Sequence, residues 1–249
     1  MNVTKKWKKW LAVSCSHGHL ANAGALKAAL EMKRRWQPDA DSVLHLGDFV
    51  DLSGLMGSAR RDPDSPERAS SIREDFDAGI SFVRELEPSH VFEGNHEHRL
   101  TALQYSPSAI VAHCCTSAKS EIYNMCKDLK AKWIGYDIEK GWKDLGGTLF
   151  GHGYMFNESS TRDHAEALRA PIVMGHLHRV DRMAGRSIGA PVGWSIGCLA
   201  NIGAMHYARR QRSVMRWQHG VAWGEYVSGG KGCTVNVLTP VGGVWRYPL

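Results

Sequence analysis

Five short blocks of the sequence combine glycine or serine with His, Asp, Asn or Cys, the side chains that bind divalent transition metals in proteins. The blocks are Cys15–His17, Gly47–Asp51, Gly94–Glu97, Gly151–Gly153 and Gly175–His178. Each block brings at least one side chain that can donate an electron pair to a metal. If the five blocks meet in space, they form a metal site, and their number favours a site for two metals.

An apolar run precedes each block and predicts a buried strand that ends there. The runs cover residues 10–13, 43–46, 90–92, 148–150 and 171–174. Short runs that contain β-branched or aromatic residues and stop at turn residues are typical of buried strands. Loops at strand ends are where functional side chains gather. We therefore expect the five blocks to converge on one edge of a sheet.

The order of these blocks resembles the calcineurin-like metallophosphoesterase superfamily, whose pattern is D-x-H, GDxxD, GNH(E/D), GH and GHxH. Four blocks match, and Cys15 stands where the family has Asp. The resemblance implies a four-layer α-β-β-α sandwich, in which two facing mixed β-sheets are flanked by helices. It also implies metal-dependent phosphoester hydrolysis, with diesters preferred. The alternatives are a phosphomonoesterase or nucleotidase of the same superfamily, and a metal-poor, non-catalytic binding scaffold.

The resemblance also implies a ligand set for two divalent transition metal ions, which would be Zn, Fe or Mn. One ion would be held by Cys15, His17, Asp48 and His178, and the other by Asp48, Asn95, His152 and His176. Asp48 would bridge the ions, since the two oxygens of a carboxylate can each take a metal. A water molecule shared by the metals would be the nucleophile.

Two further residues take roles from the same resemblance, and a third is a candidate because of its position. His96 matches the histidine near the leaving oxygen, and an imidazole can protonate an alkoxide near neutral pH. Asp51 matches the carboxylate that orients this histidine. Arg99, just past the GNHE block, is a candidate phosphate contact, although an exposed position at a helix start is equally consistent with it. Leu52 follows Asp51 where protein Ser/Thr phosphatases have Arg, which argues against a protein phosphatase.

Cys15 leaves three interpretations open. A thiolate replaces the carboxylate as a ligand, with the same charge and a preference for Zn or Fe over harder ions. Alternatively, Cys15 is a small apolar residue that does not bind, and the first metal is weak or absent. In the third interpretation the site has decayed to a scaffold. The intact remaining ligand positions favour the first.

The whole chain, with 249 residues, is long enough for one domain over 1–249. Helices are expected over 20–36 and 67–86, and a helical cap insertion at about 98–145, with helical stretches near 109–115 and 120–132. Residues 57–70 are expected to form a surface loop. Strands are expected over 192–196, 221–227 and 234–238, with a hairpin at Gly229-Gly230. His45 is expected to be a packed core histidine, and His19 and His206 are candidates for the rim of the site.

The net charge of +6, with basic clusters at 5–9 and 209–212, favours anionic partners. The expected partner is a phosphoester substrate, for which a nucleotide or nucleic acid is one candidate class. Six cysteines without disulfide-like spacing indicate reduced thiols. No apolar stretch approaches the roughly 20 residues of a membrane span. The apolar run after the N-terminal lysines is too short for a signal sequence, so we expect a cytoplasmic protein.

Overall fold

The structure is a computed structural model that describes residues 6–57, 61, 71–205 and 216–248. Two mixed sheets dominate it. The six-stranded sheet has the order β11-β10-β1-β2-β3-β4, and its strands are β1 (Trp7–Val13), β2 (Val43–His45), β3 (His90–Phe92), β4 (Lys132–Ile134), β10 (Val221–Val227) and β11 (Asn236–Leu238). The five-stranded sheet has the order β5-β6-β7-β9-β8, and its strands are β5 (Trp142–Leu145), β6 (Thr148–Gly151), β7 (Ile172–Met174), β8 (Val180–Ala184) and β9 (Val192–Ile196).

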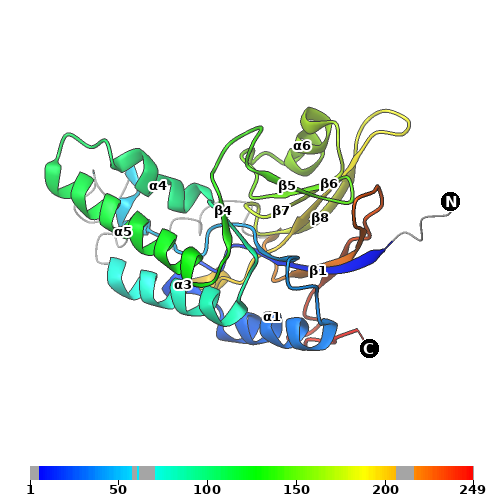
Figure 1. Cartoon of the computed structure of the whole chain (residues 1–249), viewed down its shortest axis with the longest axis horizontal. Helices are drawn as coiled ribbons and strands as arrows, with labels where there is room; N and C mark the ends of the chain where they lie inside the picture. Colours follow the sequence, from blue (N-terminus) through cyan, green and yellow to red (C-terminus); the bar gives the residue numbers. More distant parts are fainter. Residues whose placement is uncertain (1–5, 58–60, 62–70, 206–215, 249) are drawn as a thin grey trace.

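The helices cover the outer faces of the two sheets (Figure 1). Their bounds are α1 (Ala23–Trp36), α3 (Ile72–Leu86), α4 (Asn95–Leu103), α5 (Ala109–Asp128) and α6 (Ser160–Leu168), with short 3₁₀ turns η1 (Gly18–Leu20), η2 (Ser53–Leu55) and η4 (Ile202–Ala204). Helices α1, α3, α4 and α5 lie beside the six-stranded sheet, and α6 covers the five-stranded sheet (Figure 1). The predicted four-layer α-β-β-α sandwich is thus confirmed.

The central core lies between the sheets, where Trp10 and Phe92 of one sheet meet Phe150 and Val173 of the other. The rings of Trp10 and Phe150 pack edge to face, with centroids 4.7 Å apart. A second core lies between the six-stranded sheet and α1, where Met32 packs among strand residues. Because each strand of the sandwich alternates between two buried faces, the strands appear in the sequence as short, nearly continuous apolar runs.

Local sequence signals mark the ends of helices α1 and α3, which pack next to the six-stranded sheet. The side chain of Asn22 accepts a hydrogen bond from the N–H of Ala25 at 3.0 Å, and caps the start of α1. The side chain of Ser71 does the same for Glu74 at 3.2 Å in α3. Both helices end at a residue in the left-handed conformation, which a proline follows in each case. These ends agree with the expected ones.

Strand direction brings the candidate ligands to one end of the sandwich. β1, β2 and β3 run parallel to one another, and so do β6, β7 and β9. The carboxyl ends of parallel neighbours meet at the same edge. β10 pairs antiparallel to β1, with Trp7 opposite Val227. This pairing joins the N-terminal and C-terminal parts of the chain in one sheet.

The expected helical insertion over about 98–145 requires a correction. The two helical stretches are one helix, α5, and its buried residues Cys115 and Ile122 pack in the same core as Val91 of β3. After α5 the chain enters β4, which extends the six-stranded sheet, and then β5, an edge strand of the other sheet. The half-exposed, polar composition of these edge strands gives little strand signal in the sequence.

The C-terminal strands match the expectation closely, since 192–196 and 221–227 are β9 and β10 and the Gly229-Gly230 hairpin connects β10 to β11. Most of the loop expected at 57–70, together with His206 and the basic cluster at 209–212, lies outside the described residues. Among the residues that the structure describes, no helix is both long and apolar enough to cross a membrane.

Candidate metal centre

The loops at five strand ends bring all the predicted ligands together. Three overlapping groups have their possible ligand atoms within 4.8 Å of one another. They are Cys15, His17, Asp48 and His178; Asp48, His152 and His176; and His17, Asp51 and His96. The first two groups match the two ligand sets that the family resemblance implies, and they share Asp48. Asn95 joins the second group, because its Oδ1 lies 3.0 Å from His152 Nε2 and 2.8 Å from His176 Nδ1.

The first group places two imidazole nitrogens face to face. His17 Nε2 lies 3.0 Å from His178 Nε2. His17 Nδ1 lies 2.8 Å from the Asp51 carboxylate and donates its proton there, so that Nε2 of the neutral ring carries a lone pair. Cys15 Sγ accepts a hydrogen bond from the N–H of His176 at 3.3 Å. An N–H···S contact of this kind suits a sulfur that carries negative charge.

The second group also collects electron-pair donors. His152 Nδ1 donates to the carbonyl of Leu46 at 2.7 Å, so Nε2 is the nitrogen that carries a lone pair whenever the ring is neutral. This nitrogen lies 3.2 Å from Asp48 Oδ2 and 3.0 Å from Asn95 Oδ1. In the described residues, His176 Nε2 and His178 Nδ1 are buried without a hydrogen-bond partner. Several acceptors around one point repel one another unless a proton or a metal cation lies among them.

The protonation states suit metal binding with two exceptions, His152 and Cys15. Burial opposes the charged form of His152, but the Asp48 carboxylate outweighs burial and raises the pKa of this ring, which favours its protonated form until a cation binds. Burial, with the neighbouring His152, lowers the pKa of His176 to about 3. Burial, with the neighbouring His17, lowers the pKa of His178 well below its usual value. The pKa of Asp48 is well below its usual range, since the surrounding histidines outweigh its burial. Neutral imidazole and carboxylate are the forms that bind metals. Burial raises the pKa of the Cys15 thiol well above its usual value, with the Asp48 charge adding to it, so the thiol keeps its proton until a cation binds.

The backbone of the centre is held in an unusual conformation. Cys15, His17, Asp48, His176 and His178 all have positive φ angles, between 53° and 66°. Residues other than glycine adopt this left-handed region at a cost of roughly 1–3 kcal/mol each, and such residues cluster at functional sites. Hydrogen bonds between the first two loops hold it, from Cys15 N to Gly47 O and from His17 N to Asp48 O, both at 3.0 Å.

Two glycines of the motifs are required by close packing. A Cβ atom at Gly94 would come within 2.1 Å of Asp48 Oδ1. A Cβ at Gly47, whose φ is +91°, would come within 2.8 Å of both Gly94 N and His152 Nδ1. The glycines of the GD and GNH motifs therefore let the β2 and β3 loops touch, which places Asp48 beside Asn95.

His96 is held next to Asp48 by its backbone and its ring. Its N–H donates to Asp48 Oδ1 at 3.0 Å, and its ring Nδ1 forms a short contact with the main-chain carbonyl of Asp51. The other ring nitrogen, Nε2, lies 4.0 Å from Asp48 Oδ2. Burial lowers the pKa of His96 to about 4, so the ring is neutral in the free protein. Protonation of His96 thus requires an added negative charge nearby.

The Asp51 side chain lies closer to His17 than to His96, the residue that it was expected to orient. Its carboxylate lies 2.8 Å from His17 Nδ1 but 3.4 Å from His96 Nδ1. The side chain therefore orients a predicted metal ligand, and its main-chain carbonyl orients His96. The Arg99 side chain also turns toward this loop, since it donates to the carbonyls of Asp51 at 2.8 Å and Leu52 at 3.2 Å. Arg99 braces the loop and lines the cavity above the centre.

Two acidic residues with a supporting role were not predicted. The Glu97 carboxylate accepts hydrogen bonds from the N–H groups of Asp48 at 2.9 Å, Gly94 at 2.8 Å and Val50 at 3.1 Å. Asp75 of α3 accepts from the N–H groups of Asp51 and Leu52, at 3.0 and 2.7 Å. Asp75 is only 2% exposed. The sequence held a signal for each residue. Asp75 is an acidic residue next to Phe76 in an amphipathic helix, and Glu97 is the last residue of the GNHE motif.

Two other histidines lie near these elements. His45 is fully buried in β2, as expected for a core histidine, and its Nε2 lies 3.2 Å from Ser16 Oγ. His19 Nδ1 lies 3.2 Å from Asp75 Oδ1. His19 is therefore engaged with the supporting acid, and it does not line the cavity above the centre.

A cavity of about 310 Å³ opens above the cluster. Asp48, Asn95, His96 and His176 form its floor, and the wall residues are Arg99, Phe156, Leu177, His178, Arg179 and Trp217. The ring of Trp217 packs against that of His178, with centroids 4.4 Å apart. The cavity joins candidate metal ligands to two arginine side chains, which suits a small anionic group.

The α-β-β-α sandwich and the donor set at its strand ends together define a protein with a candidate metal centre. The sequence model of the calcineurin-like phosphoesterase family matches residues 8–180. The chain belongs to this family of phosphoester hydrolases, and the expected resemblance is confirmed. A comparison with curated proteins found no match.

Proposed function

We propose that the protein is a cytoplasmic phosphodiesterase that works with two divalent transition metal ions. The observation that carries the proposal is the pair of donor groups that share Asp48. A shared carboxylate between two groups of nitrogen, oxygen and sulfur donors is the arrangement that a two-metal hydrolase needs.

Each ion would have its own set of ligands. Cys15, His17, Asp48 and His178 would hold the first ion, and Asp48, Asn95, His152 and His176 would hold the second. When bound, the ions would supply positive charge that polarises the phosphoester and makes a water molecule acidic enough to attack phosphorus. Zn or Fe would suit the first position, because a thiolate is a soft ligand.

A thiolate at Cys15 is the preferred interpretation of this departure from the family. Its sulfur belongs to the predicted first group, within 4.8 Å of the ligand atoms of His17, Asp48 and His178. One side of Cys15 packs in an apolar cluster with Cys198, Ala200 and Met205, which an apolar role would also explain. The carboxylate and the two imidazoles within 4.8 Å of its sulfur favour the thiolate. The metal-poor alternatives predict no loss of metal when Cys15 is replaced.

The residues of the chain would position the substrate and move one proton. His96 lies beside Asp48 at the floor of the cavity, where a phosphoryl oxygen can reach it. The negative charge of a bound phosphoester would raise the low pKa of His96 and let Nε2 donate a proton to the leaving alkoxide. Asp51 would keep the His17 and His96 rings oriented, and Arg99 would hold the same loop at the cavity rim.

Substrate charge supports the preference for diesters. A diester carries one negative charge, so it needs less desolvation and fewer cations around it than a monoester. The lining of the cavity offers two arginines besides the metal positions. A nucleotide or nucleic acid is the preferred substrate class, in keeping with the net charge of +6. A phosphomonoesterase or nucleotidase is the second candidate, because the same floor would accept a monoester.

The test compares two leaving groups. In His96→Ala, hydrolysis of an unactivated nucleotide diester should fall roughly 10²–10⁴-fold. Hydrolysis of bis-nitrophenyl phosphate should fall much less, because nitrophenolate leaves without a proton. Metal content, measured by inductively coupled plasma mass spectrometry, should be unchanged. His113→Ala, on the exposed face of α5, is the matched control.

Three outcomes would redirect the proposal. Equal losses on both esters would mean that His96 positions the phosphate and does not donate a proton. Faster turnover of the nitrophenyl monoester than of the diester would put the phosphomonoesterase first. A gently purified protein without metal and without hydrolysis would support the scaffold.

A further inference from the structure

A second cavity, of about 490 Å³, lies at the other end of the sandwich from the metal centre. Its lining includes His90 at the start of β3, Lys132 at the start of β4, and Lys143 of β5. β3 runs from His90 toward Gly94 and Asn95, so its first residue is the one farthest from the ligands. Side chains alternate along a strand, and Phe92 points into the core between the sheets. The His90 side chain therefore also faces the space between the two sheets, but at the end away from the metal centre.

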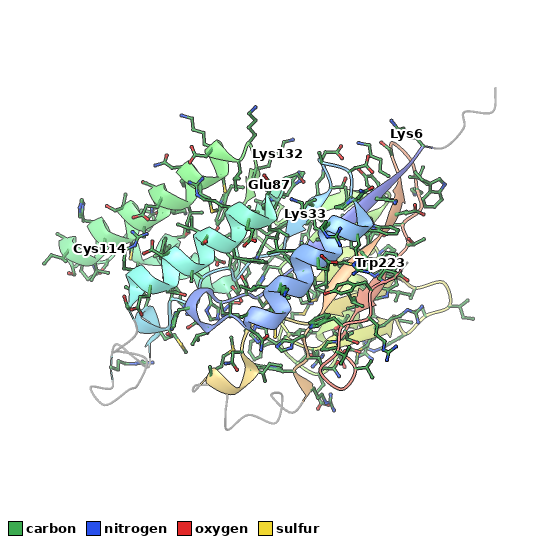
Figure 2. The ribbon with its side chains drawn as sticks, turned by 90° about the horizontal axis from the view of Figure 1, so that it is seen from below. Lys6, Lys33, Glu87, Cys114, Lys132 and Trp223 are labelled. Atoms are coloured by element: carbon green, nitrogen blue, oxygen red, sulfur yellow. The ribbon has the colours of Figure 1, made fainter. Side chains whose placement is uncertain are left out.

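Three lysines give this cavity a positive charge. Lys130, Lys132 and Lys143 line it, and no ion pair is recorded for any of them within the described residues. The two acids of the lining are paired with lysines from elsewhere: Asp41 lies 2.5 Å from Lys8, and Glu87 lies 3.0 Å from Lys33. In Figure 2, Glu87 is labelled between Lys132 and Lys33, the lysine with which it pairs. Within the described residues, the cavity thus has three lysines without an ion-pair partner, and each of its two acids is paired with a lysine outside the lining.

His90 adds a buried polar group with an unused nitrogen. The residue is 6% exposed, and its Nε2 has no hydrogen-bond partner in the described part of the chain. Ser89 Oγ donates its proton to the carbonyl of Val43 at 2.9 Å, so it must accept from His90 Nδ1 at 3.0 Å. Nδ1 therefore carries the proton of the neutral ring, and Nε2 carries a lone pair.

The charge state of His90 follows from the same surroundings. Burial, with Lys143 and Lys132, lowers the pKa of His90 to about 4. The ring is neutral at physiological pH, and its Nε2 requires a hydrogen-bond donor. A ligand that satisfies the cavity must therefore bring negative charge for the lysines and a proton for the histidine.

We propose that this second cavity binds the phosphate group of a small molecule. A terminal phosphate keeps a proton on one oxygen for part of its population near neutral pH, since its second pKa lies near 6–7. The protonated oxygen would donate to His90 Nε2, and the anionic oxygens would lie among the ammonium groups of Lys132, Lys143 and Lys130. Sulfate has a similar shape and charge but no such proton, so the site should discriminate against it.

The experiment is isothermal titration of the metal-loaded protein with inorganic phosphate and, separately, with sulfate at equal ionic strength. The double variant Lys132→Ala/Lys143→Ala should bind one phosphate fewer per chain than the native protein. Its hydrolysis of bis-nitrophenyl phosphate should be unchanged, because none of these residues belongs to the metal centre. Lys127→Ala/Lys140→Ala removes the same charge from exposed positions outside the lining and is the matched control.

Discrimination tests the role of His90 separately. Phosphate should bind to the second cavity about tenfold more tightly than sulfate, as expected for one added hydrogen bond. His90→Gln should reduce this ratio toward one, and ¹⁵N chemical shifts of the His90 ring should report phosphate at Nε2 in the native protein. An unchanged number of phosphates in the lysine double variant, or equal binding of sulfate in the native protein, would overturn the proposal.

Discussion

Glu97 offers the sharpest test of how the metal centre is built. Its carboxylate joins the loops after β2 and β3, because one oxygen accepts from the N–H groups of Asp48 and Gly94 and the other from that of Val50. The residue is 1% exposed. The Glu97→Ala variant removes all three acceptor contacts at once and leaves the side chain of every predicted metal ligand in the sequence.

The magnitude follows from the three donors that lose their acceptor. Each buried, unsatisfied N–H costs about 1–3 kcal/mol, so the total should be at least about 3 kcal/mol. One effect opposes this loss: burial and the Asp48 charge raise the pKa of Glu97 to about 7, so its removal relieves some repulsion. We expect a net loss of about 3 kcal/mol, or a fall in Tm of roughly 6–12 °C for a chain of this size.

The assay is urea-induced unfolding of metal-depleted protein, followed by titration of metal into the folded variant. Glu97→Gln should lose less, about 1–3 kcal/mol, because its single carbonyl oxygen can still accept from two of the three N–H groups. Glu85→Ala, on the exposed face of α3, should stay within about 0.5 kcal/mol of the native protein. A Glu97→Ala variant as stable as the Glu85→Ala control would refute the reasoning.

Three further predictions concern Cys15 and Asp51. Cys15→Ser should lose metal at one of the two positions and lose activity. Cys15→Asp should keep activity and shift the metal preference toward Mn. Unchanged metal content and rate in Cys15→Ala would contradict the thiolate interpretation. Because the raised pKa of the Cys15 thiol means that a proton must leave on binding, zinc affinity should rise about tenfold per pH unit between pH 7 and 8, and should stay nearly flat in Cys15→Asp. The pKa of Asp51 is depressed, since the hydrogen bond from His17 and the nearby imidazoles outweigh its burial. Its stabilising effect should therefore be present above the unfolded pKa, near 3.9, and be lost as pH falls below it, so Asp51→Asn should flatten the loss of unfolding free energy between pH 5 and 3.

Local sequence patterns predict many of the helices and strands of the fold. The buried strands that lead to the centre, β1, β2, β3, β6 and β7, appear in the sequence as apolar runs, and α1 and α3 have caps and prolines that mark their ends. The edge strands β4, β5 and β8 escaped prediction, because one side of each is partly exposed and their residues alternate weakly. The course of residues 98–145 also escaped it. Whether α5 caps a site or packs into the core depends on contacts with residues far away in the sequence, such as Val91.

The candidate site also has a part that the sequence predicts and a part that it does not. Motif spacing was enough to name the ligands that the structure brings together, because each lies directly after a strand. The partners of these ligands could not be read from spacing. The choice of Asp51 between His17 and His96 depends on a difference of 0.6 Å between contacts of 2.8 and 3.4 Å. Asp75 acts from a helix more than twenty residues away from the loop that it supports.

The strained backbone connects these observations. Cys15, His17, Asp48, His176 and His178 all have left-handed φ angles, which break the extended strand conformation where these side chains converge on the two donor groups. Unfavourable backbone at five positions persists only where other contacts enforce it, and Glu97 and Asp75 provide such contacts through buried N–H groups of the neighbouring loops. The acids that sequence reasoning missed therefore explain how the ligands that it found are held, and loss of one acid should loosen several ligands together.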